Sequence, residues 1–464
     1  MDARSLSQIA QYAGGRLSSG GADHLITRIS TDSRTIQPGD FFVSIRGDNF
    51  DGHRFVEQVA ERGAAGALVD EDWKGSVPQG FALIRVADTL LGYQRIAAGY
   101  RRSLKLKVIA ITGSNGKTST KDFAAAALGR RFRVTKTEGN FNNHVGLPRT
   151  VLEATAQDEI AVWELGMNHP GEIAPLAAIA QPDAGIITNI GIAHIEFMGS
   201  REAIAQEKGA LAEAIDSDGI MILNADDPFS ESIALRTQAK TIFAGVNSGT
   251  IRAEDIRQSA SGSEFTVLEG AHRCRAQLPV PGLHMVQNAI IAIAAGRAFG
   301  VSIEDCAAGL ASAPLTKARL QLCEIRGVQF LDDSYNANPE SMKAALRTLV
   351  ELDAEGQRIA VLGQMGELGV ESERGHIEVG QAAADLHIDH LITVGDGGAT
   401  IAQGAQAAGL GKVTRVANAS EAAGLLGEIT GAGDLVLVKG SRSARMEQVL
   451  EAFAERDATA GVAP

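Results

Sequence analysis

Residues 107–120, KVIAITGSNGKTST, have the composition of a strand followed by a phosphate-binding loop and a helix. Glycines without a Cβ let successive backbone N–H groups face phosphate oxygens, and the following helix adds its positive N-terminal end. In such a loop the lysine reaches the β- and γ-phosphates, and the next hydroxyl binds Mg²⁺. Lys117 is thus the expected catalytic cation, and Thr118 the expected metal ligand. The expected nucleotide contacts are Gly113, Ser114, Asn115, Gly116, Lys117, Thr118 and Ser119.

The loop departs from the general pattern G-x-x-x-x-G-K-[ST] at its first position. Ile111 stands where that pattern has its first glycine, and the turn uses Gly113 instead. An ordinary strand-turn-helix with a chance Gly-Lys-Thr is the alternative interpretation. The order of strand, loop and helix favours the phosphate loop.

Length and composition indicate a multidomain α/β protein. With 464 residues, 45% of them hydrophobic, the chain is too long for one core and suits about three domains. No apolar run approaches the roughly 20 residues that span a bilayer, and the start, MDARSLSQIAQYAGG, has no basic segment followed by an apolar one. We therefore expect a cytoplasmic protein without membrane insertion. Three cysteines lack metal-ligand spacing and are expected to be buried: Cys274, Cys306 and Cys323.

The net charge of −13 argues against a nucleic-acid partner, whose phosphates would require a broad basic face. A phosphorylated ligand must instead be held locally. The cations near glycine loops are Lys117, Arg319, Lys439 and Arg442.

Apolar, strand-like runs alternate with helical stretches after about residue 106. One set lies at 160–163, 184–188 and 220–223. A second set lies at 328–331, 359–362, 391–394 and 435–438. Such alternation predicts parallel sheets covered on both faces, with the site at the carboxyl ends of the strands. Between the two sets, residues 241–280 predict a small antiparallel addition, and residues 285–299 a helix.

Residues 30–55 are rich in turn formers. A Pro38-Gly39 turn separates Asp32-Ser33-Arg34 from the apolar run 41–45, and Asp51-Gly52-His53 follows. On spacing alone, this segment is a β-hairpin followed by a capped helix.

Four further side chains have both a chemical and a structural interpretation. Glu164 closes an apolar strand, and His194 lies in the loop after the next strand. Lys208 reads as a solvent-facing helix lysine, and Arg319 follows a linker near Leu315. Their structural interpretations are, in the same order, a strand-end acid, a structural histidine, a surface lysine and an arginine in an interdomain salt bridge.

Seven ordered segments resemble the Mur ligases, whose phosphate loop has the form T-G-x-x-G-K-[ST]. They are TGSNGKTS, ELGMNHPGEI, TNIGIAHIEFMGS, EKG, GLHMVQNAIIA, DDSYNANPESM and VKGSRSARMEQV. The resemblance covers essentially the whole chain and implies three domains. These are an N-terminal UDP-precursor-binding domain at 1–104, a central P-loop, parallel-sheet ATP-binding domain at 105–316, and a C-terminal Rossmann-like domain at 317–464. The last would close on ATP and the incoming dipeptide.

The two C-terminal segments are most similar to the branch of this family that joins D-Ala-D-Ala to UDP-MurNAc-tripeptide. The resemblance implies an ADP-forming amide ligase of peptidoglycan precursor synthesis that works through an acyl phosphate. It also implies these two small-molecule substrates. We expect the protein to be a monomer. Either meso-diaminopimelate or lysine is compatible with the sequence as the third residue of the accepted peptide.

The resemblance assigns further site residues. Two Mg²⁺ ions would be bound by Thr118, Glu164, His194 and a carbamylated Lys208, whose modified side chain offers oxygen ligands. Lys117, Lys208, His194 and Glu164 would be the catalytic set. Further nucleotide contacts would come from Asn288, Arg319 and Asp333. The expected substrate contacts are Ser33, Arg34, Asp51, Gly52 and His53 for the uridine diphosphate, Thr137, Asn140, Asn142 and Asn143 for the muramoyl peptide, and Tyr335, Asn336 and Asn338 in the closing loop.

Three positions depart from the family pattern. Met285 replaces an asparagine after the histidine, Ala318 replaces a glycine before the arginine, and Gln364 replaces the aspartate of G-D-M-x-E. They affect an adenine-side contact, a hinge and an acidic role of the C-terminal loop, respectively.

Two classes of alternative stay open at this point. One is another ligase of the superfamily, a Mur-type amino-acid ligase or a folylpolyglutamate synthase; the DSYNANP segment argues against the diamino-acid-adding type. The other is a P-loop binding module or switch GTPase, and the sequence has no N-K-x-D guanine-reading motif.

Overall fold

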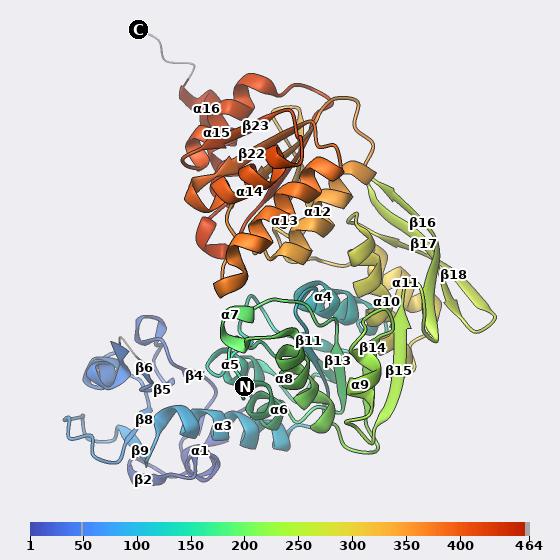
Figure 1. The fold of residues 1–464 in the computed structure, drawn as a ribbon. Coiled ribbons are helices and arrows are strands. Elements are labelled where there is room, and N and C mark those ends of the chain that lie inside the picture. Colours follow the sequence, from blue (N-terminus) through green and yellow to red (C-terminus); the bar gives the residue numbers. More distant parts are fainter. Residues whose placement is uncertain (48–49, 460–464) are drawn as a thin grey trace.

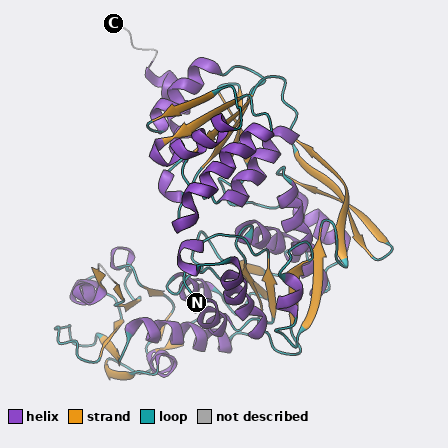
Figure 2. Cartoon of the chain, viewed as in Figure 1, coloured by secondary structure: helices purple, strands orange, loops and turns teal. Residues whose placement is uncertain are grey.

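The computed structural model describes residues 1–47 and 50–459. Figure 1 shows three parts in chain order, coloured blue, green to yellow, and orange to red. Each part has its own main sheet, and helices pack against these sheets (Figure 2). The expected α/β class with three parts is therefore confirmed. The boundaries at residues 104 and 316 stay predictions.

The N-terminal part is built on a five-stranded sheet in the order β2-β9-β8-β5-β4. Its elements are β2 (Arg16–Ser19), β4 (Ile29–Ser30), β5 (Phe41–Val43), β8 (Gly66–Asp70), β9 (Ala82–Val86), α1 (Leu6–Ala13), α2 (Val56–Glu61) and α3 (Thr89–Ser103). Short antiparallel pairs are formed by β1 (Arg4–Ser5) with β3 (Leu25–Ile26) and by β6 (Arg46–Gly47) with β7 (Phe50–Asp51).

The β-hairpin expected within residues 30–55 does not form across Pro38-Gly39; the antiparallel pair of this segment is β6 with β7. Strands β4 and β5 pair in parallel, with Ile29 opposite Phe41. All three residues of β5 are fully buried between β4 and β8, which suits an interior parallel strand. Asp51 does cap a short 3₁₀ helix, η2 (Gly52–Phe55), by accepting from the His53 N–H at 3.0 Å.

The central part holds a nine-stranded sheet in the order β11-β12-β10-β13-β14-β15-β16-β17-β18. The strands are β10 (Lys107–Thr112), β11 (Val134–Lys136), β12 (Ile160–Glu164), β13 (Ala184–Ile187), β14 (Ile220–Asn224), β15 (Lys240–Gly245), β16 (Ile251–Ser259), β17 (Gly262–Glu269) and β18 (His272–Leu278). Its helices are α4 (Lys117–Leu128), α5 (Gly146–Glu153), α6 (Ile173–Ala180), α7 (Ile195–Met198), α8 (Arg201–Glu213), α9 (Ser230–Ala234), α10 (Leu283–Ala298) and α11 (Ile303–Ala311).

The pairing agrees with the sequence pattern. Strands from β11 to β16 run parallel, and the last two pairings, β16–β17 and β17–β18, are antiparallel. The antiparallel addition expected within residues 241–280 is confirmed, although its strands extend the main sheet. The expected helix at 285–299 is α10.

The C-terminal part has a six-stranded sheet in the order β19-β20-β24-β21-β22-β23, parallel except for β19. Its strands are β19 (Gln321–Ile325), β20 (Val328–Asp333), β21 (Arg358–Leu362), β22 (His390–Val394), β23 (Val413–Val416) and β24 (Leu435–Lys439). Its helices are α12 (Pro339–Glu351), α13 (Ser372–Asp385), α14 (Gly395–Ala407), α15 (Ala419–Ile429) and α16 (Glu447–Thr459), with 3₁₀ turns η3 (Gly369–Glu371) and η4 (Arg442–Ala444).

Apolar packing joins the three parts. Helix α3 packs against α5 and α6, and helix α10 packs against both α4 and α12. One buried cluster therefore continues from the central sheet into the C-terminal part. This packing places the loop after β20 opposite the phosphate loop.

The cysteines only partly match expectation. Cys306 is buried, but Cys274 and Cys323 are partly exposed on strands, so the prediction is wrong for these two. Both lie in antiparallel pairs, which leave one sheet face less covered. Among the helices of the described chain, none is long and apolar enough to cross a membrane.

Candidate active site

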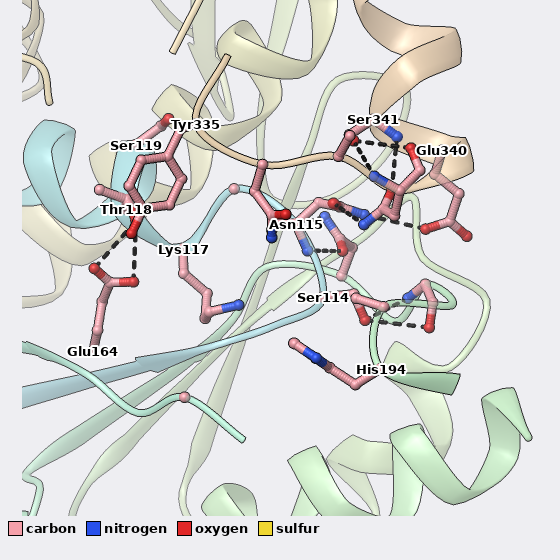
Figure 3. Close-up of a pocket in the computed structure, with 18 of the residues that line it drawn as sticks. Ser114, Asn115, Lys117, Thr118, Ser119, Glu164, His194, Tyr335, Glu340 and Ser341 are labelled. Atoms are coloured by element: carbon pink, nitrogen blue, oxygen red, sulfur yellow. Dashed lines mark hydrogen bonds between the residues drawn. The ribbon is translucent and has the colours of Figure 1, made fainter. Parts of the chain in front are cut away.

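A cavity of about 640 Å³ lies between the carboxyl edge of the central sheet and the loop after β20. Its wall includes residues from both parts, and Figure 3 shows many of them. The predicted site residues that line it are Ser114, Asn115, Gly116, Lys117, Thr118, Ser119, Asn140, Asn142, Asn143, Glu164, His194, Asn288, Arg319, Asp333, Tyr335, Asn336 and Asn338. Folding thus gathers in one place residues that are far apart in sequence.

The phosphate loop joins β10 to α4. Gly113 and Gly116 have φ of +148° and +80°. A Cβ at these glycines would lie 1.9 Å from Thr188 Oγ1 and 2.3 Å from Asn288 Oδ1, so neither position accepts a side chain. The Lys117 ammonium donates to the Gly113 carbonyl at 2.8 Å, and burial lowers the pKa of Lys117.

Thr118 and Glu164 face each other across the first turn of α4. The Thr118 hydroxyl is 3.2 Å from both Glu164 carboxylate oxygens, and Arg319 Nη2 donates to the same hydroxyl at 3.3 Å. Glu164 is only 1% exposed. This pair combines a hydroxyl with a buried carboxylate at the mouth of the loop.

Lys121 was missed by the sequence analysis. It is 1% exposed, lies 3.6 Å from a Glu164 oxygen, and donates to the Thr137 carbonyl at 2.7 Å. Lys121 lies three residues after Thr118, which places both side chains on the same face of the helix. This spacing could have predicted from the sequence that Lys121 lies near the site.

Thr137 lies behind the cavity wall and does not line it. It is fully buried, and its hydroxyl accepts from the Glu164 N–H at 2.9 Å. In this position it supports the end of β12, whereas the three asparagines that follow it reach the cavity.

Lys208 is not the surface lysine that its sequence context suggested. It lies on α8 with 1% exposure, and no ion pair with a carboxylate is seen in the described part of the chain. Burial, with the nearby charge of Lys117, holds the pKa of Lys208 well below its usual value. Lys208 is not among the residues that line the cavity.

His194 precedes α7 in a left-handed conformation, with φ of +64°. Its Nδ1 is hydrogen-bonded to a carboxylate oxygen of Glu367, which comes from the C-terminal part. This bond is the main cause that lowers the pKa of Glu367. Glu367 follows the departure at Gln364, and the sequence analysis did not assign it.

The loop after β20 covers the phosphate loop. The Arg319 guanidinium carbon lies 4.1 Å from the centre of the Tyr335 ring. Asn338 Nδ2 donates to Asn115 Oδ1 at 2.7 Å, and Asn115 Nδ2 donates to Glu340 Oε2 at 3.1 Å. Glu340 was also missed; it follows Pro339 in the first turn of α12, a position that favours an acid for purely local reasons.

Asp333 is held by the second C-terminal segment. Lys439 Nζ donates to Asp333 Oδ2 at 2.5 Å, while the Leu320 N–H donates to Asp333 Oδ1 at 3.3 Å. The Lys439 side chain is 2% exposed. Two positions that depart from the family pattern, Met285 and Ala318, also lie near the site. Asn288 Nδ2 is 3.9 Å from Met285 Sδ, and Ala318 has a φ of +59°.

The five N-terminal candidates lie outside this cavity. Arg34 is exposed and paired with Asp32 at 2.8 Å. Both ring nitrogens of His53 have partners, since Nδ1 is 2.7 Å from Asp51 Oδ1 and Nε2 accepts from the Asp70 N–H at 3.0 Å. Gly52 has no room for a Cβ beside the Ile45 backbone. Their contacts organise the N-terminal loops, with Ser33 accepting at its carbonyl from Arg62.

The donors at the phosphate loop fit Mg²⁺ bound together with a nucleotide. Within the described residues, no group of three or more His, Cys, Asp or Glu side chains could hold a metal alone. Mg²⁺ typically takes one or two protein oxygens and completes its shell with water and phosphate. The Thr118 hydroxyl and the Glu164 carboxylate supply such oxygens beside a loop that is shaped for phosphate.

Three family profiles match the chain. The Mur ligase middle domain matches residues 111–296, the Mur ligase glutamate ligase domain matches 318–442, and the Mur ligase family catalytic domain matches 25–85. Curated relatives match nearly end to end. The UDP-N-acetylmuramoyl-tripeptide--D-alanyl-D-alanine ligase of Bacillus subtilis is 40% identical over 97% of this chain and 98% of its own length. The enzyme of that name from Escherichia coli is 36% identical with the same coverage.

Solved structures agree with the sequence comparison. MurF from Acinetobacter baumannii superposes with a TM-score of 0.91 at 34% identity, covering 98% of this chain and 99% of its own. A MurF ligase from Thermotoga maritima in complex with ADP gives a TM-score of 0.84 at 28% identity, covering 92% and 97%. From the matched domains and these full-length similarities, we conclude that the chain belongs to the Mur ligase family.

Proposed function

We propose that this chain is an ATP-dependent, ADP-forming ligase that joins D-alanyl-D-alanine to UDP-MurNAc-tripeptide. The observation that carries the proposal is one cavity in which the phosphate loop faces Arg319 and the Tyr335–Asn338 segment. Relatives named for this reaction match over nearly their full length, which supports the choice of substrates. A cytoplasmic step of peptidoglycan precursor synthesis follows from the same proposal.

The chemistry requires activation because a carboxylate is a poor acceptor for an amine. In the proposed reaction, the terminal carboxylate of the tripeptide attacks the γ-phosphorus of ATP, and ADP leaves. The dipeptide amine then attacks the acyl carbon, the acyl–oxygen bond breaks, and phosphate leaves with both bonding electrons. The amine loses its proton as the amide forms. Both steps transfer negative charge, which fixed cations stabilise.

Lys117 and Arg319 are the cations placed for this task. Lys117 lies within the phosphate loop, and Arg319 reaches Thr118 from beyond the linker. Thr118 and Glu164 would hold Mg²⁺, which when bound neutralises charge on the transferred phosphoryl group. Asn288 and the Asn338–Asn115 contact would position the nucleotide.

We further propose that Lys208 is carbamylated and supports a second Mg²⁺ together with His194. Carbamylation needs a neutral amine to react with carbon dioxide, and a buried lysine beside another cation meets that requirement. The product is an anion with oxygen ligands, which suits a hard cation.

The remaining assignments belong to the same proposal. The N-terminal residues Ser33, Arg34, Asp51, Gly52 and His53 would bind the uridine diphosphate, and the asparagines 140, 142 and 143 the muramoyl peptide. A monomer as the working unit belongs to the same proposal.

The test is release of ADP and phosphate from ATP in the presence of Mg²⁺. We expect release only when UDP-MurNAc-tripeptide and D-Ala-D-Ala are both present, with either diaminopimelate or lysine as the third residue of the peptide. The product should be heavier than UDP-MurNAc-tripeptide by one D-Ala-D-Ala unit, less the water lost in forming the amide. D-Glu, a free diamino acid, and folate with glutamate serve as competing acceptors. Turnover with one of these instead would assign the chain to another branch of the superfamily.

A further inference from the structure

A contact across the cavity edge connects His194 with Glu367. Besides the side-chain hydrogen bond, the Glu196 N–H donates to the Glu367 carbonyl at 3.3 Å. The next glycine, Gly369, lies against Glu196, where an added Cβ would come within 3.1 Å of its Cα. The C-terminal part therefore meets the start of α7 through both backbone and side chain.

The loop that carries Glu367 is held firmly by its own part of the chain. Met365 and Leu368, on either side, are 4% and 2% exposed. The Met365 N–H donates to His376 Nε2 at 2.9 Å, and His376 Nδ1 is 2.6 Å from the Ser372 carbonyl. Glu367 is thus presented by a supported loop, while its own side chain stays 46% exposed.

We propose that Glu367 is a positioning residue that orients His194 when the C-terminal part closes on the central part. A carboxylate at Nδ1 keeps the proton on that nitrogen and leaves the Nε2 lone pair free to bind a metal. Metal-binding histidines are commonly held in this way, and loss of the outer carboxylate typically weakens metal binding or activity 10- to 100-fold. The proposal rests on the proposed function only in taking His194 as a Mg²⁺ ligand.

The consequence is a metal site that is complete only in the closed molecule. Arg319, Asn338 and Glu340 also make hydrogen bonds across the cavity, to Thr118, to Asn115 and to the Ile192 N–H. The bonds to Thr118 and Asn115 act on the phosphate loop and the bond to Ile192 acts on the loop after β13, and none of them involves the His194 ring. Glu367 therefore makes the orientation of the His194 ring depend on closure of the C-terminal part. This role is separate from covering the nucleotide.

The test measures Mn²⁺ binding by electron paramagnetic resonance, with a non-hydrolysable ATP analogue present. We expect Glu367→Ala to lower the Mn²⁺ affinity of the site that includes His194 by 10- to 100-fold. Glu367→Gln should lose less, because its amide oxygen still accepts from Nδ1–H. The matched control is Glu371→Gln, four residues along the same loop and paired with Arg374 at 3.1 Å, which should bind Mn²⁺ like the parent protein.

Kinetics give a second readout that a merely structural role would not produce. In Glu367→Ala the Mg²⁺ concentration for half-maximal turnover should rise by a similar factor, with kcat largely recovered at saturating Mg²⁺. Thermal melting shows whether each variant folds. Unchanged Mn²⁺ binding in folded Glu367→Ala, or an equal loss in Glu371→Gln, would overturn the proposal.

A double-mutant comparison separates this inference from the proposed function. In a His194→Ala background, Glu367→Ala should cause no further loss of Mn²⁺ binding, because its target is gone. Normal Mn²⁺ binding in His194→Ala would show that the histidine is not a metal ligand. It would reject both the ligand role of His194 and the positioning role of Glu367. A loss in His194→Ala without a loss in Glu367→Ala would reject only the positioning role. Absence of D-Ala-D-Ala ligation in the unmutated protein would reject the proposed reaction independently.

Discussion

The Thr118 hydroxyl is equidistant from the two carboxylate oxygens of Glu164, at 3.2 Å from each. The pair connects the first turn of α4 with the last residue of β12, the strand next to β10 in the sheet. A hydroxyl that follows the loop lysine and a buried carboxylate from the adjacent strand are thereby held at one point. This geometry underlies the first prediction.

Glu164→Gln should slow turnover by about a hundredfold or more, the loss expected when one fixed electrostatic contact at the reacting group is removed. It should also raise the Mg²⁺ requirement. Breaking a buried ion pair typically costs about 3–5 kcal/mol. We expect a smaller loss of unfolding free energy here, because Lys121 retains two other partners. They are Asp122, at 3.6 Å, and the Thr137 carbonyl. Denaturant unfolding and Mg²⁺ titration test both parts, with exposed Glu231→Gln as control. Normal turnover would contradict the assignment.

Lys117→Ala should abolish ligation and leave the fold intact. Among the described residues, the one hydrogen-bond partner of the Lys117 ammonium is the Gly113 carbonyl. The substitution therefore removes mainly the positive charge that faces the phosphates. We expect a decrease of about a hundredfold or more in kcat at saturating ATP. The exposed lysine variant Lys412→Ala is the control for loss of a positive charge. Near-normal turnover with Lys117→Ala at saturating ATP would reject the phosphate-loop assignment.

Arg319→Lys should behave more like Arg319→Ala than a conservative exchange would suggest. The guanidinium both stacks at 4.1 Å on Tyr335 and donates to Thr118, and a lysine cannot do both with one planar group. We expect a raised KM for ATP and a lower kcat, with Tm within a few degrees of the parent protein. Arg347→Ala, an exposed arginine on α12, controls for charge. A collapsed Tm with unchanged kinetics would favour a salt-bridge role instead.

Lys208→Ala should be nearly inactive, and acetate should restore part of the activity by supplying carboxylate oxygens near the second Mg²⁺. A surface lysine would behave differently, with a stability change within about 0.5 kcal/mol and normal turnover. Lys240→Ala provides that comparison. Full activity of Lys208→Ala would remove this residue from the site, as would a bare ammonium at Lys208 in a high-resolution map of active enzyme.

His284 should make stability depend on pH. Burial lowers its pKa to about 4 from 6.5, opposed by Asp333 and assisted by Lys439. Between these values the unfolded chain binds a proton that the folded chain does not, so stability falls as pH decreases from about 6.5 to 4. His284→Gln removes this contribution, and its Tm should decline less steeply over that window than the parent protein's. His24→Gln, at an exposed site, should follow the parent protein; parallel curves for His284→Gln would refute the prediction.

Several features were determined by local sequence. The phosphate loop could be recognised because its chemistry depends on consecutive residues from Gly113 to Ser119, and the chain itself brings them together. The buried strands before Glu164 and in the C-terminal part were predictable because strands covered on both faces are continuously apolar. Parallel strands end at one edge, so Glu164 could be expected close to Thr118.

Other features were decided only by tertiary packing. The pattern around residue 41 predicted a hairpin, yet β5 pairs in parallel with β4 on one side and with β8 on the other. Lys208 has the local sequence of a surface lysine, and only the packing of α8 buries it beside Lys117. Glu367 meets His194 across 173 residues of chain. Local patterns encode which backbone conformations are favourable, whereas the burial of a charge and the partner it meets depend on surfaces contributed by distant segments.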